Sequence, residues 1–381
     1  MAKRIAMHIL GLGVLAGLVP AGAWAQEKPA ARSRPATEPA GRPADARPVI
    51  KVKTAEQFVA ALAPNRVVEL EPGEYVLSKV KRGKLAHVHW QEAMDKQYEL
   101  VVRNVPNLGI RGLGSKPVSV LTEHPYAFVL SFRNAPNLAL SNLKLGHAPD
   151  AGYCSGGVVS VDEANRVTIA GCILYGCGTE GLALRKVQGL VFSQSVIEDC
   201  TYGILTANDC RDLHFRKSVF RNNAKFHGFA LIDCTGVTFV DCLIRDNLLG
   251  ALRDPLFKIN LQTDDAKVRL TGGRIIDNAG ASLCNEKGMV VLDKTAESNN
   301  SWQAAAEVIK ARGTKVAAPG GGWTYHTDIG ETDLWDVAVS VYGNGRYRAL
   351  LAQANPGLPK KLRPDTRIIC PPPSRQPPKD R

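Results

Sequence analysis

Three residues in the middle of this 381-residue chain have side chains suited to acid–base chemistry: Glu180, Arg185 and His227. A carboxyl group and an imidazole can exchange protons near neutral pH, and a guanidinium can neutralise an anionic group of a substrate. Each of the three lies near a glycine that opens a short apolar segment, so successive segments could bring them together. A solvent-exposed loop position is the simpler interpretation for each, which makes them weak catalytic candidates.

Other charged or titratable residues lie at the edges of the same segments. These are Asp162, Glu163, Asp209, Lys225, Arg253 and Asp254, with His87 and His89 in an earlier insertion. A solvated loop is again the better explanation for all of them. The sequence has no C-x-x-C and no histidine at ligand spacing, so we expect neither a metal site nor a cofactor.

The segments that hold these residues form a repeat. Two apolar residues separated by one position recur at intervals of 30, 29, 23, 23, 24 and 31 residues. The pairs are Leu108/Ile110, Leu138/Leu140, Val167/Ile169, Leu190/Phe192, Leu213/Phe215, Val237/Phe239 and Val268/Leu270. Alternation with a period of two predicts strands.

Further columns of the repeat predict its turns. Small residues stand five positions after the later pairs, namely Cys172, Ser195, Ser218, Cys242 and Gly273. Gly, Asp or Asn stands nine positions after them, and Cys or Asn ten positions after, which predicts turns with left-handed backbone. An apolar strand opens at Gly157, Gly181, Gly203 and Gly228, and we align these glycines with one another.

A unit of 22–24 residues with two or three short strands cannot bury its apolar face alone, but stacking in register gives each strand a partner one coil away. The pattern resembles the right-handed parallel β-helix of pectate-lyase-like proteins over about residues 49–292. The resemblance implies a mainly β fold of about eight coils whose first coil lies under a capping helix. Residues 54–57 (Thr-Ala-Glu-Gln) form a capping box that predicts this helix, ending at Leu62. A leucine-rich horseshoe is the rival repeat, but its leucine-asparagine consensus is absent.

The same alignment predicts which residues face outward. One outward row would be Val159, Ala183, Leu205 and Ala230, and the next would be Val161, Arg185, Ala207 and Ile232. Polysaccharide-cleaving β-helix enzymes place carboxylates, Lys, Arg or His on an outward strand face or in lateral loops. A mostly apolar face with a single arginine is instead typical of a surface covered by a loop, by another module or by a partner.

The N-terminal region predicts export. Residues 1–25 have the pattern of a secretory signal peptide, with Lys3 and Arg4 before an apolar run and Ala-Trp-Ala at 23–25 as the cleavage site. The run is short for a membrane span. Residues 26–48 are rich in proline and lack apolar periodicity, which predicts a disordered linker. We therefore expect a periplasmic or secreted protein with no transmembrane span.

Nine cysteines in an exported chain make disulfides chemically possible. Cys177/Cys200 and Cys210/Cys234 are neighbours in adjacent coils, where Cα atoms lie about 4.8 Å apart, but parallel side chains disfavour a bridge. Buried cysteine behaves as a small apolar residue. We expect stacked free cysteines and at most one or two disulfides.

After Leu292 the repeat stops. Residues 301–311 predict a short helix that closes the stack, and three glycines at 320–322 predict a hinge. Apolar residues then recur at helical spacing within 334–341 and within 347–354. A strand on either side of these helices would give a small α+β module.

The motifs of this module resemble the lysin motif (LysM), which binds glycans containing N-acetylglucosamine, such as peptidoglycan or chitin. They are Leu-Trp-Asp-Val-Ala at 334–338, Tyr-Gly-Asn-Gly at 342–345, Gln-Ala-Asn-Pro at 353–356 and Ile-Ile-Cys-Pro at 368–371. The resemblance implies a glycan groove formed by Glu331, Thr332 and Asp333 on one side and by Asn355, Pro356, Gly357 and Leu358 on the other. The first loop is one residue longer than usual, and Asp365 replaces a frequent glycine. A module used only for packing or protein contact is the alternative.

The predicted parts are a signal peptide (1–25), a Pro-rich disordered linker (26–48), a right-handed parallel β-helix (49–292), a helix with a Gly-rich linker (293–322), a LysM-like domain (323–372) and a basic Pro-rich tail (373–381). The formal net charge of +12 is concentrated at the ends: residues 1–48 hold seven basic and three acidic side chains, and residues 301–381 hold twelve and seven. A basic end on a nearly neutral rod favours attraction to an anionic wall or membrane surface. Together with export it argues against a nucleic-acid partner.

Two hypotheses for function follow. The first is a non-catalytic cell-envelope protein whose β-helix contacts carbohydrate or protein and whose LysM-like module holds it to peptidoglycan. The alternative is a polysaccharide lyase, glycoside hydrolase or epimerase acting on a cell-wall or uronate-containing polysaccharide. The two differ in whether the outward face of the β-helix carries chemistry.

Overall fold

The computed structural model describes residues 47–94, 96–148, 156–176, 178–200, 202–225, 227–249, 254–302, 315–318, 321–327, 331, 333–342, 345–363 and 366–373. The predicted signal peptide, nearly all of the linker, the tail after residue 373 and residues 303–311 of the predicted closing helix lie outside these ranges.

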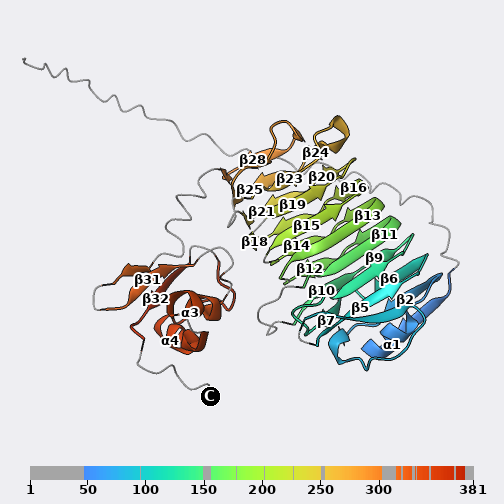
Figure 1. The fold of residues 1–381 in the computed structure, drawn as a ribbon, viewed down its shortest axis with the longest axis horizontal. Helices are drawn as coiled ribbons and strands as arrows, with labels where there is room; N and C mark the ends of the chain where they lie inside the picture. The colour runs from blue at the N-terminus through green and yellow to red at the C-terminus, as the bar shows by residue number, and fades with distance from the viewer. Residues whose placement is uncertain are drawn as a thin grey trace, which may run out of the picture. The chain divides into compact units, whose positions relative to one another are not determined.

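Parallel strands stack coil upon coil to form a β-helix (Figure 1). Its largest sheet has 16 strands in two branches, because β11 (Val159–Ala170) and β13 (Glu180–Ser193) are long enough to belong to both. The first branch, called the site face below, adds β4 (Val88–Glu92), β5 (Tyr98–Arg103), β8 (Leu130–Arg133), β15 (Gly203–Asn208), β19 (His227–Ile232) and β23 (Phe257–Ile259). The second branch adds β1 (Val49–Val52), β2 (Arg66–Leu70), β6 (Leu108–Gly112), β9 (Ala139–Ser141), β16 (Arg211–Arg216), β20 (Thr238–Val240), β24 (Val268–Thr271) and β27 (Val290–Asp293).

A nine-stranded sheet forms another wall of the helix, with one strand from each coil, close to the eight coils expected. It contains β3 (Glu74–Val76), β7 (Val118–Thr122), β10 (Leu143–His147), β12 (Ile173–Tyr175), β14 (Val196–Glu198), β17 (Val219–Arg221), β21 (Leu243–Arg245), β25 (Arg274–Ile276) and β28 (Ala296–Ser298). A short four-stranded sheet follows it in the later coils: β18 (Ala224–Lys225), β22 (Leu248–Leu249), β26 (Ala279–Gly280) and β29 (Ser301–Trp302). Two short 3-10 turns, η1 (Leu77–Lys79) and η2 (Asp264–Ala266), join strands at the two ends of the stack.

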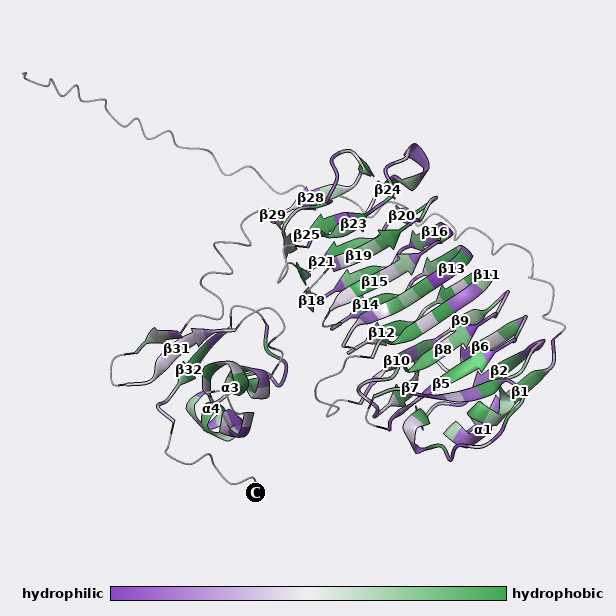
Figure 2. Ribbon diagram, viewed as in Figure 1, coloured by the Kyte–Doolittle hydropathy of each residue, from purple (hydrophilic) through white to green (hydrophobic). Residues whose placement is uncertain are grey.

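The strand register confirms the repeat predicted from the apolar pairs. Leu190, for example, pairs with Val167 in the coil before it and with Leu213 in the coil after it. Inward side chains form one continuous apolar core along the axis. Hydrophobic residues recur along the stacked strands, as the green segments of the ribbon in Figure 2 show. Phenylalanines stack within it, with ring centroids 4.5 Å apart for Phe215 and Phe239. Like side chains in successive coils therefore bury one another, which a single coil could not do.

The predicted capping helix is confirmed as α1 (Ala55–Ala61). The Thr54 side chain accepts a hydrogen bond from the Gln57 backbone N–H, and the Gln57 side chain accepts one from the Lys53 backbone N–H. The helix buries Phe58 and Val59 on the first coil. The cap therefore covers apolar surface that would otherwise lack a neighbouring coil.

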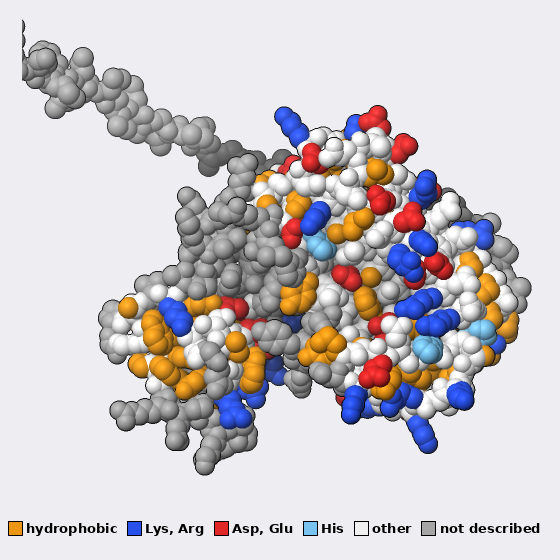
Figure 3. Space-filling view, in the orientation of Figure 1, with side chains coloured by type: hydrophobic (Ala, Val, Ile, Leu, Met, Phe, Trp, Pro, Cys, Tyr) orange, Lys and Arg blue, Asp and Glu red, His pale blue; other side chains and the backbone are white. Residues whose placement is uncertain are grey.

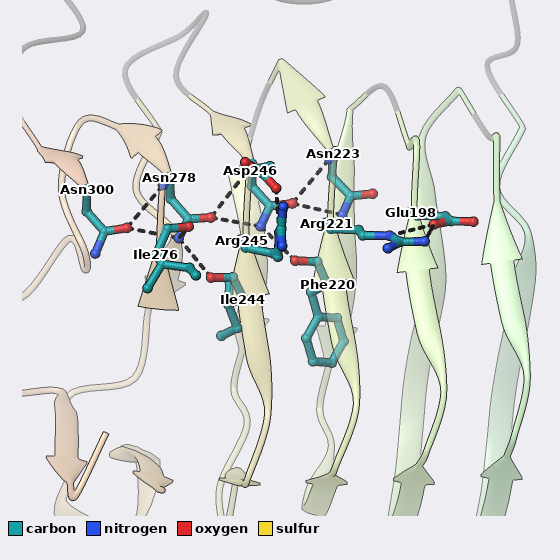
Figure 4. A network of polar contacts seen from close by, with 11 residues as sticks. Glu198, Phe220, Arg221, Asn223, Ile244, Arg245, Asp246, Ile276, Asn278 and Asn300 are labelled. Atoms are coloured by element: carbon teal, nitrogen blue, oxygen red, sulfur yellow. Dashed lines mark hydrogen bonds and ion pairs between the residues drawn. The ribbon is translucent and has the colours of Figure 1, made fainter. Parts of the chain in front are cut away.

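The turn after the nine-stranded sheet is held by a ladder of asparagines, one per coil (Figure 4). The amide of Asn223 donates to the Oδ1 atom of Asn247 at 3.0 Å, and Asn247 donates likewise to Asn278 at 2.9 Å. Asn278 then donates to Asn300 at 3.0 Å. The residue before each of them adopts the predicted left-handed backbone, with φ between 54 and 56° at positions 222, 246 and 277.

The β-helix ends later than the sequence predicted. β28 pairs with β25, and β29 pairs with β26, so the stack continues to Trp302 rather than stopping at Leu292. The prediction of a helix beginning at Ser301 is wrong for its first two residues, which form β29. In the last coil, Val290 and Leu292 of β27 still continue the apolar pair, in register with Val268 and Leu270. The strand β28 that follows is exposed, and its backbone still pairs because a parallel ladder needs no particular side chain.

The C-terminal module has its own sheet and core. Its sheet is antiparallel and consists of β30 (Lys315–Ala317), β31 (Trp323–His326) and β32 (Arg367–Cys370). α3 (Leu334–Tyr342), the 3-10 turn η3 (Gly345–Tyr347) and α4 (Arg348–Ala354) lie between β31 and β32 in the chain. The predicted order of strand, helix, helix and strand is found, whereas β30 lies in the segment expected to be helix and linker. No described helix is both long and apolar enough to cross a membrane.

Candidate functional site

The register of the site face corrects the predicted outward rows. Ser160 pairs with Ala183, and Ala183 pairs with Thr206, so these positions face outward together. Val159 and Leu205, predicted to face outward, are fully buried in the core. The true outward row is Ser131, Ser160, Ala183, Thr206, Ala230 and Lys258. Ala183 and Ala230 of the first predicted row are thus correct, and in the second row Arg185 and Ile232 face outward, whereas Val161 and Ala207 are buried. The mostly apolar face was wrong, because serine, threonine and lysine occupy the other outward positions.

The error arose from the glycines that open the strands. Gly203 pairs with Glu180, while the contacts that a side chain at Gly181 would make are with core atoms of Ile197 and Cys200. The four glycines thus belong to two different rows. Each of these strands starts with one outward residue followed by two consecutive inward residues. The alternation of inward and outward side chains is therefore interrupted once in each strand. A shift of one residue moves a whole strand's side chains to the other face.

The register brings two of the three predicted catalytic residues together. Glu180 and His227 pair with Gly203 from the coils on either side of it. The Thr206 hydroxyl, on the same strand as Gly203, lies 3.3 Å from Glu180 Oε2 and 3.4 Å from His227 Nε2. Glu180, Thr206 and His227, called the acid–base cluster below, therefore share one patch of the site face. Thr206 was not predicted, because the misaligned rows hid its position.

Gly203 leaves room for this convergence. A Cβ atom at this position would lie 3.2 Å from His227 Nε2, which is closer than nearly all such contacts in proteins. Two coils separate the backbones of Glu180 and His227, about 9.6 Å at the usual strand spacing. Only a residue without a side chain between them lets both reach the Thr206 hydroxyl.

Burial alters the protonation of both titratable groups. It raises the pKa of Glu180 above its usual value, against the opposing effect of the hydrogen bond from Thr206. Burial also lowers the pKa of His227, while the charge of Asp254 raises it and that of Lys258 lowers it. Both shifts favour the uncharged forms, a carboxylic acid and a neutral imidazole. The pKa values of the two groups thus approach each other, which favours proton exchange between them.

Arg185, the third predicted residue, does not join the cluster. It lies five residues beyond Glu180 on β13, roughly 16 Å at the usual rise. Its guanidinium forms an ion pair with Asp162 of the coil before. The other Asp162 carboxylate oxygen is buried without a hydrogen-bond partner.

Arg185 instead belongs to a row of charged residues parallel to the cluster. Arg103 pairs with Arg133, Arg133 pairs with Asp162, and Asp162 pairs with Arg185, one coil apart each time. Arg133 donates a hydrogen bond of 2.9 Å to Gln91. Three guanidiniums stand beside one carboxylate in this row, called the arginine row below. Basic and acidic side chains are interspersed over this part of the surface (Figure 3).

The remaining predicted residues have other roles. Glu163 lies in a turn and pairs with Lys186, and Asp209 has left-handed backbone in the equivalent turn of a later coil. Asp254 pairs with Lys258 at 3.2 Å beside His227. His87 lies just before β4, and His89 lies on it, at the edge of the site face. Arg253 and the side chain of Lys225 lie outside the described residues.

Two predicted glycan-binding residues of the C-terminal module form hydrogen bonds within the module itself. Glu331 is only 7% exposed and accepts a hydrogen bond of 2.7 Å from the Tyr325 hydroxyl. Asp333 caps α3, accepting from the backbone N–H groups of Trp335 at 2.8 Å and Asp336 at 3.1 Å. Both acidic groups stabilise the module's own loop, so neither points freely into a groove.

The other side of the predicted groove is mixed. The Asn355 side chain donates to the Ile369 carbonyl and accepts from the Ile369 N–H, both at 2.8 Å, and so joins α4 to β32. Pro356 and Gly357 are exposed, and Leu358 packs partly against the module core. Thr332 lies outside the described residues.

The seven described cysteines are free thiols, five of them buried in the β-helix. Within the described part of the chain, no group of three or more His, Cys, Asp or Glu side chains is placed to hold a metal ion.

The family comparison identifies the fold. A family model described as a right-handed β-helix region matches residues 140–301. The chain is similar to the Escherichia coli protein YbhC, with 14% identity over 73% of this chain and 90% of that chain and a TM-score of 0.41. It is also similar to an alginate lyase from Paenibacillus sp. str. FPU-7 (13% identity, 67% and 97% coverage, TM-score 0.36) and a pectate lyase from Paenibacillus sp. 0602 (9%, 83% and 91%, 0.37). No curated protein matches the sequence. The strand pairing and the family match together define the protein as a right-handed parallel β-helix.

Proposed function

We propose that this protein is a β-helix enzyme that cleaves an anionic, uronate-containing polysaccharide by β-elimination, with His227 as base and Glu180 as acid. The observation that carries the proposal is the convergence of these two side chains on the Thr206 hydroxyl over Gly203. The hypothesis of a non-catalytic rod depended on an apolar outward face, and that premise does not hold for the polar site face.

The protonation states of the cluster match the steps of an elimination. A neutral His227 can take the proton from the carbon beside a uronate carboxylate, and a protonated Glu180 can give its proton to the leaving glycosidic oxygen. After one turnover the imidazole carries the extra proton and the carboxyl group has lost one. The Thr206 hydroxyl, within 3.4 Å of both, can pass the proton back and restore the starting state.

The arrangement favours a lyase over a hydrolase or an epimerase. Hydrolases usually need two carboxyl groups on either side of the scissile bond, whereas the cluster offers one carboxyl and one imidazole. An epimerase must return the proton to the opposite face of the carbon. Glu180 and His227 rise from the same sheet and reach the substrate from one side, as elimination of a proton and an oxygen on the same face requires.

The arginine row supplies charge for an anionic polymer. Arg103, Arg133 and Arg185 lie on β5, β8 and β13 of the site face, and β13 also carries Glu180. At about 16 Å from Glu180 along β13, Arg185 would contact a uronate group of a neighbouring sugar rather than the reacting one. With one carboxylate among them, they leave positive charge for binding uronate groups.

The test is a panel of uronate and amino-sugar polymers incubated with the purified protein, with formation of unsaturated sugar ends measured by absorbance. We expect product from a uronate polymer, and a fall in kcat of about 10²–10⁴-fold for Glu180→Gln and for His227→Gln. Glu163→Gln is the matched control for the carboxyl, and His214→Gln for the imidazole, because both lie away from the cluster. Activity that survives both cluster variants, or a product without unsaturated ends, would refute the lyase mechanism.

We further propose that the protein is exported and that its C-terminal module binds an N-acetylglucosamine-containing glycan such as peptidoglycan. The order of β31, α3, α4 and β32 supports a LysM-like module. Because Glu331, Asp333 and Asn355 are engaged inside the module, we expect the contacts to involve Pro356 and Gly357. Removal of residues 323–381 should abolish sedimentation with insoluble peptidoglycan, and unchanged sedimentation would exclude this role.

A further inference from the structure

Two buried cysteines lie in register on adjacent coils, two residues after the ends of β15 and β19. Arg211 pairs with Thr235, which places Cys210 and Cys234 in register, and the Thr235 N–H donates to the Cys210 carbonyl at 3.1 Å. In-register residues of adjacent strands have Cα atoms about 4.7–4.9 Å apart, inside the range that a disulfide spans. The backbone therefore already has the separation that a bridge needs.

The two side chains also lie in the same part of the core. Cys234 Sγ donates to the Ala207 carbonyl at 3.4 Å and Cys210 Sγ to the Asn208 carbonyl at 3.3 Å, so both thiols reach the end of β15. A hydrogen bond with the Cys234 side chain is the main reason for the lowered pKa of Cys210, and the same contact raises the pKa of Cys234. Both residues are almost completely buried, at 0 and 2% exposure. Each sulfur atom thus has the other as a close neighbour in a site closed to solvent.

The other described cysteines of the β-helix have different neighbours. The Cys172 N–H bonds the Ser195 hydroxyl of the next coil, and the Cys200 N–H bonds the Asn223 side chain. Cys242 lies against Gly273. Within the described residues, Cys210 and Cys234 form the one pair of cysteines in register on adjacent coils.

We propose that Cys210 and Cys234 are an oxidation site at which a disulfide joins two coils of the β-helix. The oxidant is a low-molecular-weight disulfide such as oxidised glutathione. The Cys210 thiolate attacks one sulfur of the oxidant and forms a mixed disulfide, releasing one thiolate. The Cys234 thiolate then attacks the Cys210 sulfur and releases the second thiolate, so the protein loses two electrons and two protons and the oxidant is reduced to two thiols.

Burial determines when the bond forms. A buried pair is out of reach of the oxidant in the finished helix, so the bond forms during folding, before the next coil closes over it. Once formed, it is protected from reductants by the same packing. The bridge follows directly after β15 and β19, the strands that carry Thr206 and His227. The inference that the bond fixes the spacing of two catalytic groups rests on the proposed function. The formation of the bond does not rest on it.

The experiment uses the full chain, unfolded with reductant and refolded in oxidised and reduced glutathione. Remaining thiols are blocked in denaturant, and the protein is cut by a protease that cleaves before aspartate. This cleavage places Cys200, Cys210, Cys234 and Cys242 in four different peptides, because an aspartate lies before or between each of them. We expect residues 209–211 linked to residues 233–240, with a mass two hydrogen atoms below the sum of the thiol peptides.

Matched variants separate this bond from unspecific oxidation. Wild type and Cys172→Ser should each lose two titratable thiols on refolding with the oxidant, whereas Cys234→Ser should lose none. Wild type refolded without oxidant should have a thermal midpoint roughly 4–16 °C below that of oxidised wild type, whereas the two preparations of Cys234→Ser should have the same midpoint. Blocked thiols at both positions in most refolded molecules, or a link from Cys210 to any other cysteine, would overturn the proposal.

Discussion

The asparagine ladder and the acid–base cluster lie in the same stack but use repetition in opposite ways. In the ladder, each coil places an asparagine at the same position, and every amide donates to the next one along the axis. In the cluster, three successive coils place a glutamate, a glycine and a histidine in one row. Identical residues satisfy one another, whereas the broken row leaves polar groups whose proton affinities are shifted by burial.

This difference indicates where chemistry can arise on a repeat protein. A ladder of like residues gives each polar group a hydrogen-bond partner. These hydrogen bonds stabilise the folded state, and no group is left to bind a substrate. A row that changes residue type from coil to coil pairs groups imperfectly. Such a row costs stability locally but offers donors and acceptors to a ligand, as functional sites commonly do.

The largest expected effect is on the ladder. Asn247→Ala removes the acceptor of the Asn223 amide and the donor to the Phe220 carbonyl at 3.0 Å, and so leaves buried polar groups unpaired. We expect a loss of about 3–4 kcal/mol in the free energy of unfolding, measured with urea. Asn300→Ala, at the half-buried end of the ladder, is the control and should cost less. Equal losses at the two sites would mean that the ladder is not a continuous network.

The space over Gly203 should matter for activity and not for folding. Gly203→Ala places a methyl group 3.2 Å from His227 Nε2 and should displace the imidazole from Thr206. We expect kcat on the uronate polymer to fall about 100-fold with little change in the urea midpoint. Gly109→Ala is the control, because its methyl group would make an ordinary 3.4 Å contact with Val67. A Gly203→Ala enzyme with full activity would contradict the proposed geometry.

The pH dependence should report the two opposing pKa shifts. The active cluster holds one proton, so activity falls at low pH when a second proton binds and at high pH when the last one leaves. Because the pKa of Glu180 is raised and that of His227 is lowered, the two pKa values approach each other and the kcat/KM profile should be a narrow bell at mildly acidic pH. A broad plateau extending above pH 8 would show that the two groups do not act as a pair.

Removal of the Thr206 hydroxyl should have a smaller effect than loss of either titratable group. Thr206→Val keeps the shape of the side chain but cannot pass a proton between His227 and Glu180. We expect kcat to fall about tenfold with KM unchanged, and Thr206→Ser to restore most of it. An equal loss in the serine variant would mean that the side chain acts by packing instead.

The smallest effect concerns stability at the cluster itself. Because burial holds the folded pKa of Glu180 above its unfolded value, the stability that its protonated form provides is lost as pH rises through the folded pKa. Glu180→Gln should therefore raise the thermal midpoint slightly at pH 7 and leave it unchanged near pH 4. Glu163→Gln, in an exposed turn, should change neither value. A lower midpoint for Glu180→Gln at pH 7 would argue against an unfavourable buried charge.

Much of the fold could be predicted because stacked coils require similar residues at a regular spacing in the sequence. The apolar pairs, the small-residue column and the left-handed turn positions were all confirmed, since each depends on one coil matching the next. The convergence of Glu180 and His227 was also found, whereas Arg185 proved to belong to the arginine row. The outward rows were wrong because two adjacent inward residues interrupt the alternation, and no residue type marks that interruption.

The amino-acid sequence by itself determined the period of the helix, its capping end and the core residues of the second branch, because apolar spacing and turn chemistry act locally and repeat. Only the tertiary structure decided which side chains share the outer surface. Thr206, Arg103 and Arg133 gain their neighbours from pairing between coils that lie about 23–30 residues apart in the chain. A shift of one residue in that pairing would bury them or separate them, so the candidate site is a property of the register.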